Sequence, residues 1–498
     1  MENINKCQDD KFDKISKLLK NYNYLCNKKQ INKNIFKKYK NNKKIYSKIQ
    51  SKNLKYYEII LNERLNHKFY KQINLRSVKN SIYYIFEKFK SGIYISIRNN
   101  NLNYFYLNNS QYINEYKHLD INRKDIIKNL VYKNKNKWKF TGCLVNVLSY
   151  NSSMEFYKKN KWKLPEEQLK DNKTYYKVVF YLSNIIDWLN LLLKERKISD
   201  VDFIINIHDQ LCLTNNYDEP LNHLFYKNKK ISKKYRFKKY LPILSLGFYK
   251  KNYLDLPFIT PDDIMRITKK YYPPGCSNNY INTNYVKNWN NKIPTAMFRG
   301  SSTSCGTNTF NNPRLKVAYL NNKWKNNERY NNNNKIDGIQ YLNAGITTMF
   351  QRYKKHKSDK YIKKMPMEIL TKDNILIKEI ELLDLKEQSK YKYLLYIEGN
   401  VLAYRIASMF RMHSVILYVE SEYKPWFYNF LKNYENIIFV KKDLSNLGKI
   451  ITWCKKNDNE CKKIAENAYK LYQKIFTKKG LLDYTEFLLN NIANNFEN

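Results

Sequence analysis

This sequence is poor in glycine, with 11 in 498 residues, or about 2%, where average proteins have about 7%. Glycine is needed where the backbone takes a positive φ or must approach another group closely. The few positions that keep glycine are therefore informative. Two of them, Gly300 and Gly306, lie in the stretch TAMFRGSSTSCGTN (295–308), beside an arginine and a run of hydroxyl side chains. This loop is the first candidate for a binding site.

Several other features are missing. No run of 18 apolar residues occurs, which argues against a membrane-spanning helix, and the start, MENINKCQDDKFDK, lacks the apolar core of a signal peptide. A cytoplasmic location is therefore expected. The eight cysteines and six histidines show no CxxC and no zinc-like spacing, so we expect reduced, mostly buried thiols and no bound metal. Cys454 and Cys461, seven residues apart, fit helical faces.

The chain is strongly basic, with a formal net charge of +47. Lys, Asn, Ile and Tyr are all heavily used, and all have codons rich in A and T. Compositional bias therefore explains the charge better than a phosphate-binding face does, and no specific nucleic-acid partner is expected. Residues 1–60 hold 16 Lys against 5 acidic residues. We expect residues 1–70 to form a basic, flexible or loosely helical extension, with contact to anionic partners as the alternative.

The remaining pattern is typical of an α/β protein. Alternating aromatic and aliphatic residues from residue 81 onward predict strands, 183–198 predicts a helix and 201–209 a buried strand. Further along, YLLYIEG, VLAYRIASMFRM (401–412) and SVILYVE (414–420) predict one βαβ unit. The stretch NECKKIAENAYKLYQKIF predicts a helix ending near Gly480. Its buried face would hold Cys461, Ile464, Ala465, Ala468, Leu471 and Ile475.

Candidate site residues follow from these positions. In the loop, Arg299 with Gly300, Ser301 and Thr303 could cradle a phosphate, although no GxxxxGK[ST] or GxGxxG motif is present and a solvated loop is the alternative. Arg405 follows the βαβ turn, where phosphates bind at helix N-termini, and a surface ion pair is the alternative.

Asp209 ends the predicted strand FIINIHD, where a general base could lie, and a turn-capping Asp is the alternative. Its neighbour His208 fits a structural or acceptor-lining role better than a metal ligand. Asp200 and Asp202 precede that strand, and we interpret both as loop residues.

These features occur in an order that resembles a known family. MFRGSSTSCGTN followed by NPRLKVAYL, with Arg314, is similar to the FRGS/T and N-x-R signatures of CAP10-like glycosyltransferases (family 90). That family includes protein O-glucosyl- and O-xylosyltransferases and fungal capsule xylosyltransferases. SKYKYLLYIEGNVLAYRIASMFRMHSVILYVES resembles its K-Y-K-Y…G…R…S-V-I block, and the similarity runs from about residue 138 to 490. The spacer NPRLKVAYL…DGIQYLNAGIT looks most like giant DNA virus members, for which the host cytoplasm or a virus factory would be the location.

The resemblance implies a GT-B architecture, in which two Rossmann-like domains face each other across a cleft. We assign residues 71–285 to the acceptor-side domain, 286–480 to the nucleotide-sugar domain and 481–498 to a C-terminal helix or tail. The family implies metal-independent, inverting transfer of a hexose or pentose, of glucose or xylose type, from a UDP-sugar, with no further cofactor. The acceptor would be a hydroxyl of an unknown protein, glycan or lipid-linked partner.

The resemblance also assigns roles to individual residues. It makes Asp209 the base and His208, where Arg is common, acceptor-lining. The nucleotide-sugar site would comprise Arg299, Gly300, Ser301, Thr303, Arg314, Asn400, Val401, Leu402, Ala403, Tyr404 and Arg405. The alternative function is a basic nucleic-acid-binding or inactive structural protein on a degenerate transferase fold.

Overall fold

The computed structural model describes residues 51–89, 91–108, 172–220, 230–249, 252–268, 285–304, 306–326, 335–336, 339–350, 353–354 and 363–496. Most of the basic extension expected at residues 1–70 therefore lies outside the described residues. The chain divides into two compact units, Met1–Glu58 and Ile59–Asn498. All that follows concerns the second unit, apart from helix α3 (Ser51–Leu65), which begins in the first.

The first sheet of this unit is mixed and has the strand order β2-β1-β3-β4-β6. Strands β1 (Ser91–Arg98) and β2 (Asn101–Asn108) form a hairpin whose two turn residues, Asn99 and Asn100, both have positive φ, as a type I′ turn requires. Strand β1 also pairs antiparallel with β3 (Val201–Ile205). Strands β4 (Ile243–Ser245) and β6 (Leu256–Pro257) then continue the sheet in parallel.

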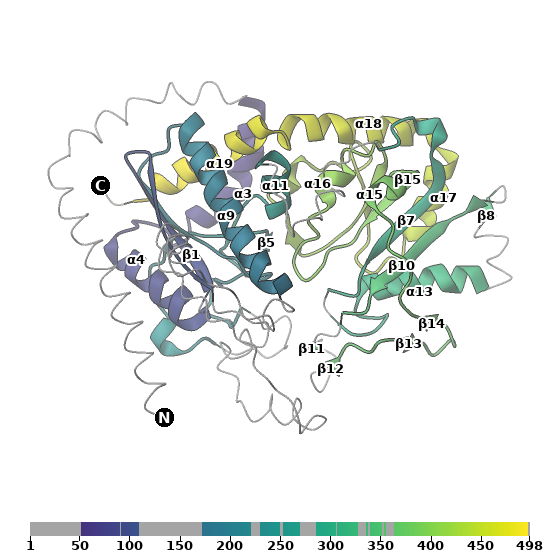
Figure 1. The fold of residues 1–498 in the computed structure, drawn as a ribbon, viewed down its shortest axis with the longest axis horizontal. Helices are drawn as coiled ribbons and strands as arrows, with labels where there is room; N and C mark the ends of the chain where they lie inside the picture. Colours follow the sequence, from purple (N-terminus) through teal and green to yellow (C-terminus); the bar gives the residue numbers. More distant parts are fainter. Residues whose placement is uncertain are drawn as a thin grey trace. The chain divides into compact units, whose positions relative to one another are not determined.

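The helices beside the first sheet include α9 (Asn172–Glu195), α11 (Pro261–Thr268) and the C-terminal α19 (Lys478–Ala493) (Figure 1). Helix α19 lies against α9, where the Trp188 indole donates to Thr485 Oγ1 at 3.3 Å, and the Tyr484 hydroxyl donates to the Pro257 carbonyl of β6 at 2.5 Å. The C-terminal helix α19 thus packs beside the first sheet, whose strands lie between residues 91 and 257.

The second sheet is entirely parallel, in the order β10-β7-β15-β16-β18. Its strands are β7 (Ile293–Ser301), β10 (Leu342–Thr348), β15 (Tyr391–Tyr396), β16 (Val415–Val419) and β18 (Ile438–Val440). Helices α13 (Pro313–Asn326), α17 (Leu447–Lys456) and α18 (Asp458–Ile475) pack on one face of it. The predicted α/β class with Rossmann-like parallel strands is confirmed.

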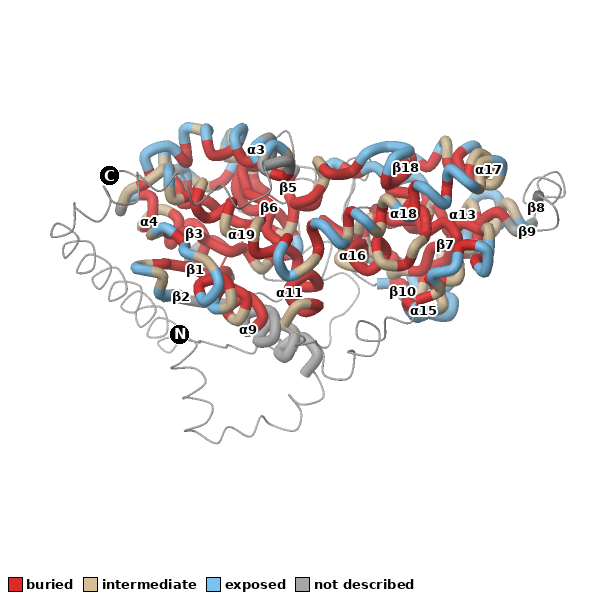
Figure 2. The backbone as a smooth tube through the Cα atoms, turned by 90° about the horizontal axis from the view of Figure 1, so that it is seen from above, coloured by how far each residue is buried: buried red, intermediate tan, exposed pale blue. Residues whose placement is uncertain are grey.

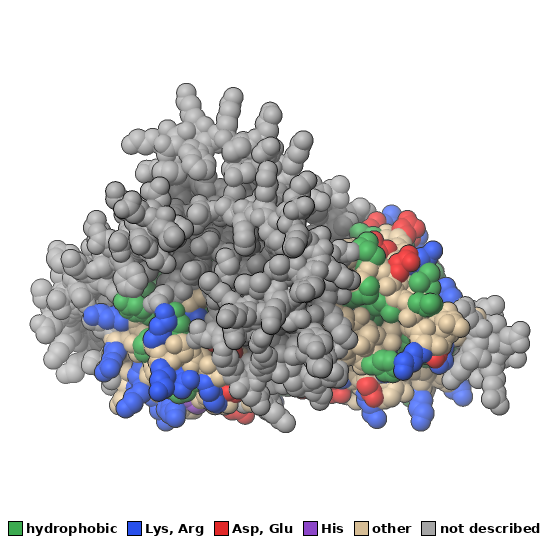
Figure 3. All heavy atoms as spheres, turned by 90° about the horizontal axis from the view of Figure 1, so that it is seen from below, with side chains coloured by type: hydrophobic (Ala, Val, Ile, Leu, Met, Phe, Trp, Pro, Cys, Tyr) green, Lys and Arg blue, Asp and Glu red, His purple; other side chains and the backbone are tan. Residues whose placement is uncertain are grey.

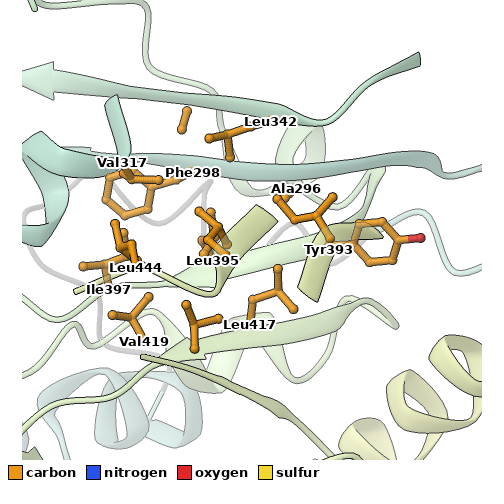
Figure 4. Packing of buried hydrophobic residues seen from close by; sticks show 14 of the residues in the cluster. Ala296, Phe298, Val317, Leu342, Tyr393, Leu395, Ile397, Leu417, Val419 and Leu444 are labelled. Carbon is orange, nitrogen blue, oxygen red and sulfur yellow. The ribbon is translucent and has the colours of Figure 1, made fainter. Parts of the chain in front are cut away.

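Alternation along the strands explains the core beneath these helices. Tyr393, Leu395 and Ile397 of the β15 segment point to the same face and meet Leu417 and Val419 of β16 (Figure 4). Parallel strands covered by helices are buried, and Figure 2 shows β7 coloured as largely buried, as are β1 and β3 of the first sheet. Figure 3 shows Lys and Arg side chains on described surface toward both sides of the view.

The remaining elements are short. They are α4 (Leu75–Ile82), η3 (Tyr83–Phe89), η4 (Lys233–Tyr235), η5 (Trp289–Asn291), α15 (Leu385–Gln388), α16 (Ile406–Met409), η6 (Tyr428–Phe430) and the strand pairs β5–β17 (Phe248–Tyr249, Tyr423–Lys424), β8–β9 (Lys335–Ile336, Ile339–Gln340), β11–β12 (Tyr353–Lys354, Lys363–Lys364) and β13–β14 (Ile369–Leu370, Leu376–Ile377).

The prediction of strands from residue 81 onward is wrong at its start. Residues 81–89 are helical, as the end of α4 and the π-helix η3, and the first strand begins at Ser91. The buried residues Val78, Ile82, Ile85 and Phe89 are three or four apart, which is helical spacing. Asn74 caps this helix by accepting from the amides of the second and third helical residues.

Two further predictions need correction. Asp202 is a residue of β3 rather than of a loop; it is buried, pairs with Arg98 and accepts from the Tyr94 hydroxyl at 3.1 Å. The helix expected over 401–412 is shorter and comprises only α16, because Val401 and Leu402 are packed in an apolar cluster with Leu211, which follows the first sheet's strand β3.

The predicted face of α18 is confirmed, since all six of its residues are buried. The helix ends at Ile475, before Gly480. There Thr477 begins α19 by accepting from the Gly480 amide at 3.3 Å.

Candidate functional site

The parallel sheet reverses its order at β7. The chain runs from β7 through α13 to β10 on one side, and later forms β15 on the other side of β7 (Figure 1). In open α/β sheets ligands bind beyond the carboxyl ends of the strands at such a reversal. The segments that leave β7 and β15 at this edge, 302–312 and 397–405, are therefore where a ligand site is expected.

The loop after β7 is organised by one side chain. The Asn312 amide donates to the carbonyls of Ser302 (3.0 Å), Thr303 (3.3 Å) and Gly306 (3.3 Å), and its Oδ1 accepts from the Arg314 amide at 3.0 Å, in the first turn of α13. Gly306 has φ +89°, and a Cβ there would lie 2.1 Å from Asn311 Oδ1. The scarce glycine is thus required by this turn.

Arg314 joins the ends of β7 and β15. Its guanidinium donates to the Ser301 carbonyl (3.0 Å) and Thr303 Oγ1 (2.6 Å) on one side, and to the carbonyls of Ile397 (2.9 Å) and Glu398 (2.7 Å) on the other. Burial, followed by the neighbouring charge of Arg405, lowers the pKa of Arg314 to about 9. Arg314 therefore holds the two loops together as a buried cation.

Arg405, the N-cap residue of α16, lies next to Arg314. A Cβ on Gly300 would be 3.5 Å from Arg405 Nη2 and 3.6 Å from Arg314 Nη1, and both guanidiniums lie over the Phe298 ring, at 5.1 and 5.9 Å from its centre. Arg405 Nη1 also donates to the Arg299 carbonyl. Two like charges that repel each other at this edge favour binding of an anion between or beside them.

Arg299 is turned away from this pair. Its guanidinium donates to the carbonyls of Phe298 and Asn343, both at 3.0 Å, and to Asn343 Oδ1 at 2.8 Å, and burial lowers its pKa. Neighbouring residues of a strand point to opposite faces, so the side chains of Phe298 and Arg299 separate. The structure brings Gly300, Ser301, Thr303, Arg314 and Arg405 together and places the Arg299 side chain along β10.

Asn400 connects this site to the first half of the unit. Its Oδ1 accepts from the Ser304 amide at 3.3 Å, and its Nδ2 donates to Asp209 Oδ2 at 3.0 Å. The next residues support the turn: Val401 and Leu402 are packed in the apolar cluster with Tyr404 against it, and the Ala403 amide donates to the Tyr396 hydroxyl at 3.2 Å. Asp209 is thereby brought to the turn that leads to Arg405.

Asp209 lies four residues beyond the end of β3, in a bend, and its side chain is exposed. His208 beside it is buried, its amide donates to Asn206 Oδ1 at 2.9 Å, and its ring lies 6.0 Å from that of Phe89. His208 thus points into the protein, whereas Asp209 faces solvent and Asn400.

A buried polar network fixes the loop that carries Asp209. Asn206 Nδ2 donates to the Gln210 carbonyl (2.5 Å) and to Ser245 Oγ (2.9 Å), and Ser245 Oγ donates to Asp255 Oδ1 (2.6 Å). Asp255 also accepts from the amides of residues 212 and 213, at 2.7 and 2.8 Å. Burial raises the pKa of Asp255 to about 6, against these hydrogen bonds.

Sequence reasoning did not single out Asn206, Ser245 or Asp255. Asn206 and Ser245 end or follow apolar strands, and this strand-end position is the signal by which they could have been found. Among the described residues, Cys212, Cys454 and Cys461 are buried, and no group of three or more Cys, His, Asp or Glu side chains is placed to hold a metal ion. No helix in the described ranges has the length and apolar character needed to cross a membrane.

A reversal point in a parallel sheet, lined by two arginines and glycine-containing turns, defines an α/β domain with a cationic edge to which an anion could bind. Residues 277–497 match the model of glycosyl transferase family 90. The resemblance to CAP10-like glycosyltransferases is therefore confirmed over this part of the chain.

The chain is also similar to longer proteins. It is 30% identical to uncharacterized protein 035R of Invertebrate iridescent virus 3, over 86% of this chain and 37% of that protein, and 29% identical to protein 179R of Invertebrate iridescent virus 6, over 86% and 38%. Human protein O-glucosyltransferase 3 is 27% identical over 41% of this chain and 32% of its own length. The chain thus spans less than two fifths of the viral relatives that it matches.

Proposed function

We propose that this chain is a UDP-sugar-dependent glycosyltransferase of the GT-B type that needs no metal and inverts the anomeric carbon. The observation that supports this most is the pair formed by Arg314 and Arg405 beside Gly300, at the reversal point of the parallel sheet. A nucleoside diphosphate carries its negative charge on the group that leaves, and fixed cations stabilise charge that develops there in the transition state.

In this proposal Asp209 is the general base. Its carboxylate takes the proton of an acceptor hydroxyl, the acceptor oxygen forms a bond to the anomeric carbon, and the bond from that carbon to the diphosphate oxygen breaks. UDP leaves with the bonding electron pair, beside Arg405. Asn400 supports this assignment, because its amide contacts both Asp209 and the loop after β7.

The relatives leave the sugar and the acceptor as proposals. Human protein O-glucosyltransferase 3 is named for O-glucosyl transfer to protein, and a glucose- or xylose-type donor is the first to test here. An unidentified protein, glycan or lipid-linked molecule would supply the hydroxyl, and the cytoplasm remains our expected location.

The test separates binding from chemistry. UDP should raise the Tm of the chain, with and without EDTA, because it binds the folded state. UDP-sugars are then screened for hydrolysis or transfer in the parent and in Asp209→Asn. Asn keeps the shape and can still accept from Asn400, so UDP affinity and Tm should hold while turnover falls by roughly 10²–10⁴.

The opposing outcomes are distinct. A Tm shift that disappears in EDTA and returns with Mn²⁺ would refute the metal-free part. Turnover within a few-fold of the parent in Asp209→Asn would remove Asp209 as the base. No UDP binding, together with binding of random RNA or DNA that falls steeply with salt, would favour the nucleic-acid alternative.

A further inference from the structure

Two stretches of the chain, one before β1 and one between β3 and β4, form a dense basic surface. Residues 67–80 and 230–240 together hold ten Lys and Arg and no Asp or Glu, whereas the whole chain has 91 basic and 44 acidic residues. A compositional bias toward Lys spreads positive charge over every surface, but it does not remove the acidic residues from one of them. We call this surface the basic face, and its members are Lys68, Lys71, Arg76, Lys79, Lys230, Lys233, Lys234, Arg236, Lys238 and Lys239.

Backbone contacts hold the two stretches side by side. The Tyr240 amide donates to the Phe69 carbonyl at 3.0 Å, and the rings of these two buried residues lie 5.2 Å apart. The Asn80 side chain donates to the Lys239 carbonyl at 2.8 Å, and Lys239 Nζ donates to the Lys71 carbonyl. The backbone that carries the charges is therefore fixed on an aromatic layer.

The charged side chains of the basic face reach solvent. Eight of the ten are exposed, and the other two, Lys79 and Lys239, are partly exposed. Figure 3 shows Lys and Arg side chains gathered on the described surface at the left of the view. Lys230 forms an ion pair with Asp218 at 2.8 Å, which compensates one of the ten charges. A surface with such an excess of positive charge attracts an anionic partner.

The residue types of the basic face favour a lipid surface over a nucleic acid. Eight members are lysines, which are flexible point charges, and two are arginines, whose planar forks suit phosphates at fixed positions. The rings of Phe69, Tyr235 and Tyr240 are buried, so they cannot stack on bases. An anionic bilayer presents a continuous negative field that flexible lysines can meet without a fixed geometry.

An exposed ring lies next to the basic face. Tyr83 is 37% exposed, and its amide donates to the carbonyls of Lys79 and Asn80, so it follows Lys79 by one helical turn. Tyrosine is enriched at the headgroup level of membranes, because its ring is apolar and its hydroxyl is polar. Positive charge beside an exposed tyrosine fits the interface of a bilayer.

We propose that the basic face docks this chain on an anionic lipid surface. The lysines contact the phosphates and carboxylates of the headgroups, and the docking needs no membrane-spanning helix. The segment that carries Asp209 continues to Asp218, which bridges to Lys230, so the basic face adjoins the part of the chain that holds the proposed base. The docking itself does not depend on the proposed function.

Binding to vesicles tests this proposal. The full chain is mixed with phosphatidylcholine vesicles that contain either no phosphatidylserine or about 30% of it, and binding is measured by sedimentation at about 0.1 M salt. Because the whole chain is basic, the decisive comparison is between two variants of equal net charge. The face variant carries Lys68→Gln, Lys71→Gln, Lys233→Gln and Lys238→Gln. The control variant carries Lys449→Gln, Lys456→Gln, Lys462→Gln and Lys470→Gln, four exposed positions on α17 and α18.

The parent and the control variant should bind the anionic vesicles within about threefold of each other. The face variant should bind them at least about 30-fold more weakly, because each basic residue near an anionic surface contributes roughly a fivefold factor. Arginine at the same four positions keeps the charge and should restore binding. Vesicles of phosphatidylcholine alone should bind none of these proteins. Tm and affinity for UDP should be the same in all of them, because the changed side chains are exposed and lie outside the proposed nucleotide site.

Three results would overturn the proposal. Equal losses in the face and control variants would show that overall charge binds the vesicles and not the basic face. Equal binding of the parent to neutral and anionic vesicles would exclude charge as the cause. If the face variant loses binding to random duplex DNA or single-stranded RNA but keeps vesicle binding, the occupant is a nucleic acid. Each of these results leaves UDP binding unaffected, so the proposed function is tested separately.

Discussion

Replacing Arg405 by alanine tests the arginine pair most directly. The guanidinium lies 3.5 Å from where a Cβ on Gly300 would be, with Arg314 at 3.6 Å from the same point. A charge-assisted hydrogen bond to a diphosphate oxygen contributes on the order of 1.5–3 kcal/mol. Arg405→Ala should therefore weaken UDP binding roughly ten- to a hundredfold. The bond from Arg405 to the Arg299 carbonyl is also lost, which should cost about 1 kcal/mol of folding stability.

Arg411→Ala is the matched control. It removes the same charge six residues further along, from a side chain that lies over the rings of Tyr285 and Tyr472 at 5.6 and 5.5 Å. Affinities for UDP are measured by calorimetry at about 0.1 M and about 0.5 M salt, because salt screens charges and so weakens charge-dependent binding. The parent and Arg411→Ala should bind alike, and both should lose more affinity with salt than Arg405→Ala.

Two results would refute this reasoning. If Arg405→Ala binds UDP within twofold of the parent, the cation beside Gly300 does not contact the diphosphate. If Arg411→Ala loses as much affinity as Arg405→Ala, the effect is one of overall charge and not of position.

Two other predictions concern the loops around the site. Gly306→Ala should lower the free energy of unfolding by about 2 kcal/mol and weaken UDP binding, because φ is +89° there and the added Cβ would meet Asn311. Gly448→Ala in α17 is the control and should be neutral or stabilising, because its Cβ would make only an ordinary contact with Trp324 at 3.7 Å. Equal melting temperatures of the two variants would contradict this prediction. Asp255 has a folded-state pKa of about 6 against its usual 3.8, so protonation favours the folded state and its contribution is lost as pH rises from about 4 to about 6. Across that window the parent should lose on the order of 2–3 kcal/mol more unfolding free energy than Asp255→Asn, and parallel pH curves would refute the buried carboxyl.

Local patterns predicted much of this fold. The six buried positions of α18 follow from helical spacing, and the strands at 391–396 and 415–419 follow from short apolar runs. The prediction of a helix over 401–412 was wrong because tertiary packing outweighed helix propensity. Leu402 is buried with Leu211, a residue almost two hundred positions earlier in the chain. Such a contact leaves no periodic signal in the sequence.

The site shows the same division. An arginine beside glycine marks the loop, but the direction of its side chain depends on strand parity. Arg299 belongs to β7 and points along β10, whereas Arg314 from α13 and Arg405 from the following βαβ unit meet beside Gly300. The residue types could be predicted, and their grouping required the sheet.

Asn400 shows what only the tertiary structure supplies. Its side chain both accepts and donates. Asn400 Oδ1 accepts from the Ser304 backbone amide, and Asn400 Nδ2 donates to Asp209, which is 191 residues away in the chain. An aspartate in its place could not donate and would set a second carboxylate beside Asp209, while an alanine would leave the turn after β15 unconnected to the loop after β7. An amide is therefore the side chain that can accept from one loop and donate to the carboxylate of the other, and this requirement joins the proposed base to the proposed diphosphate site.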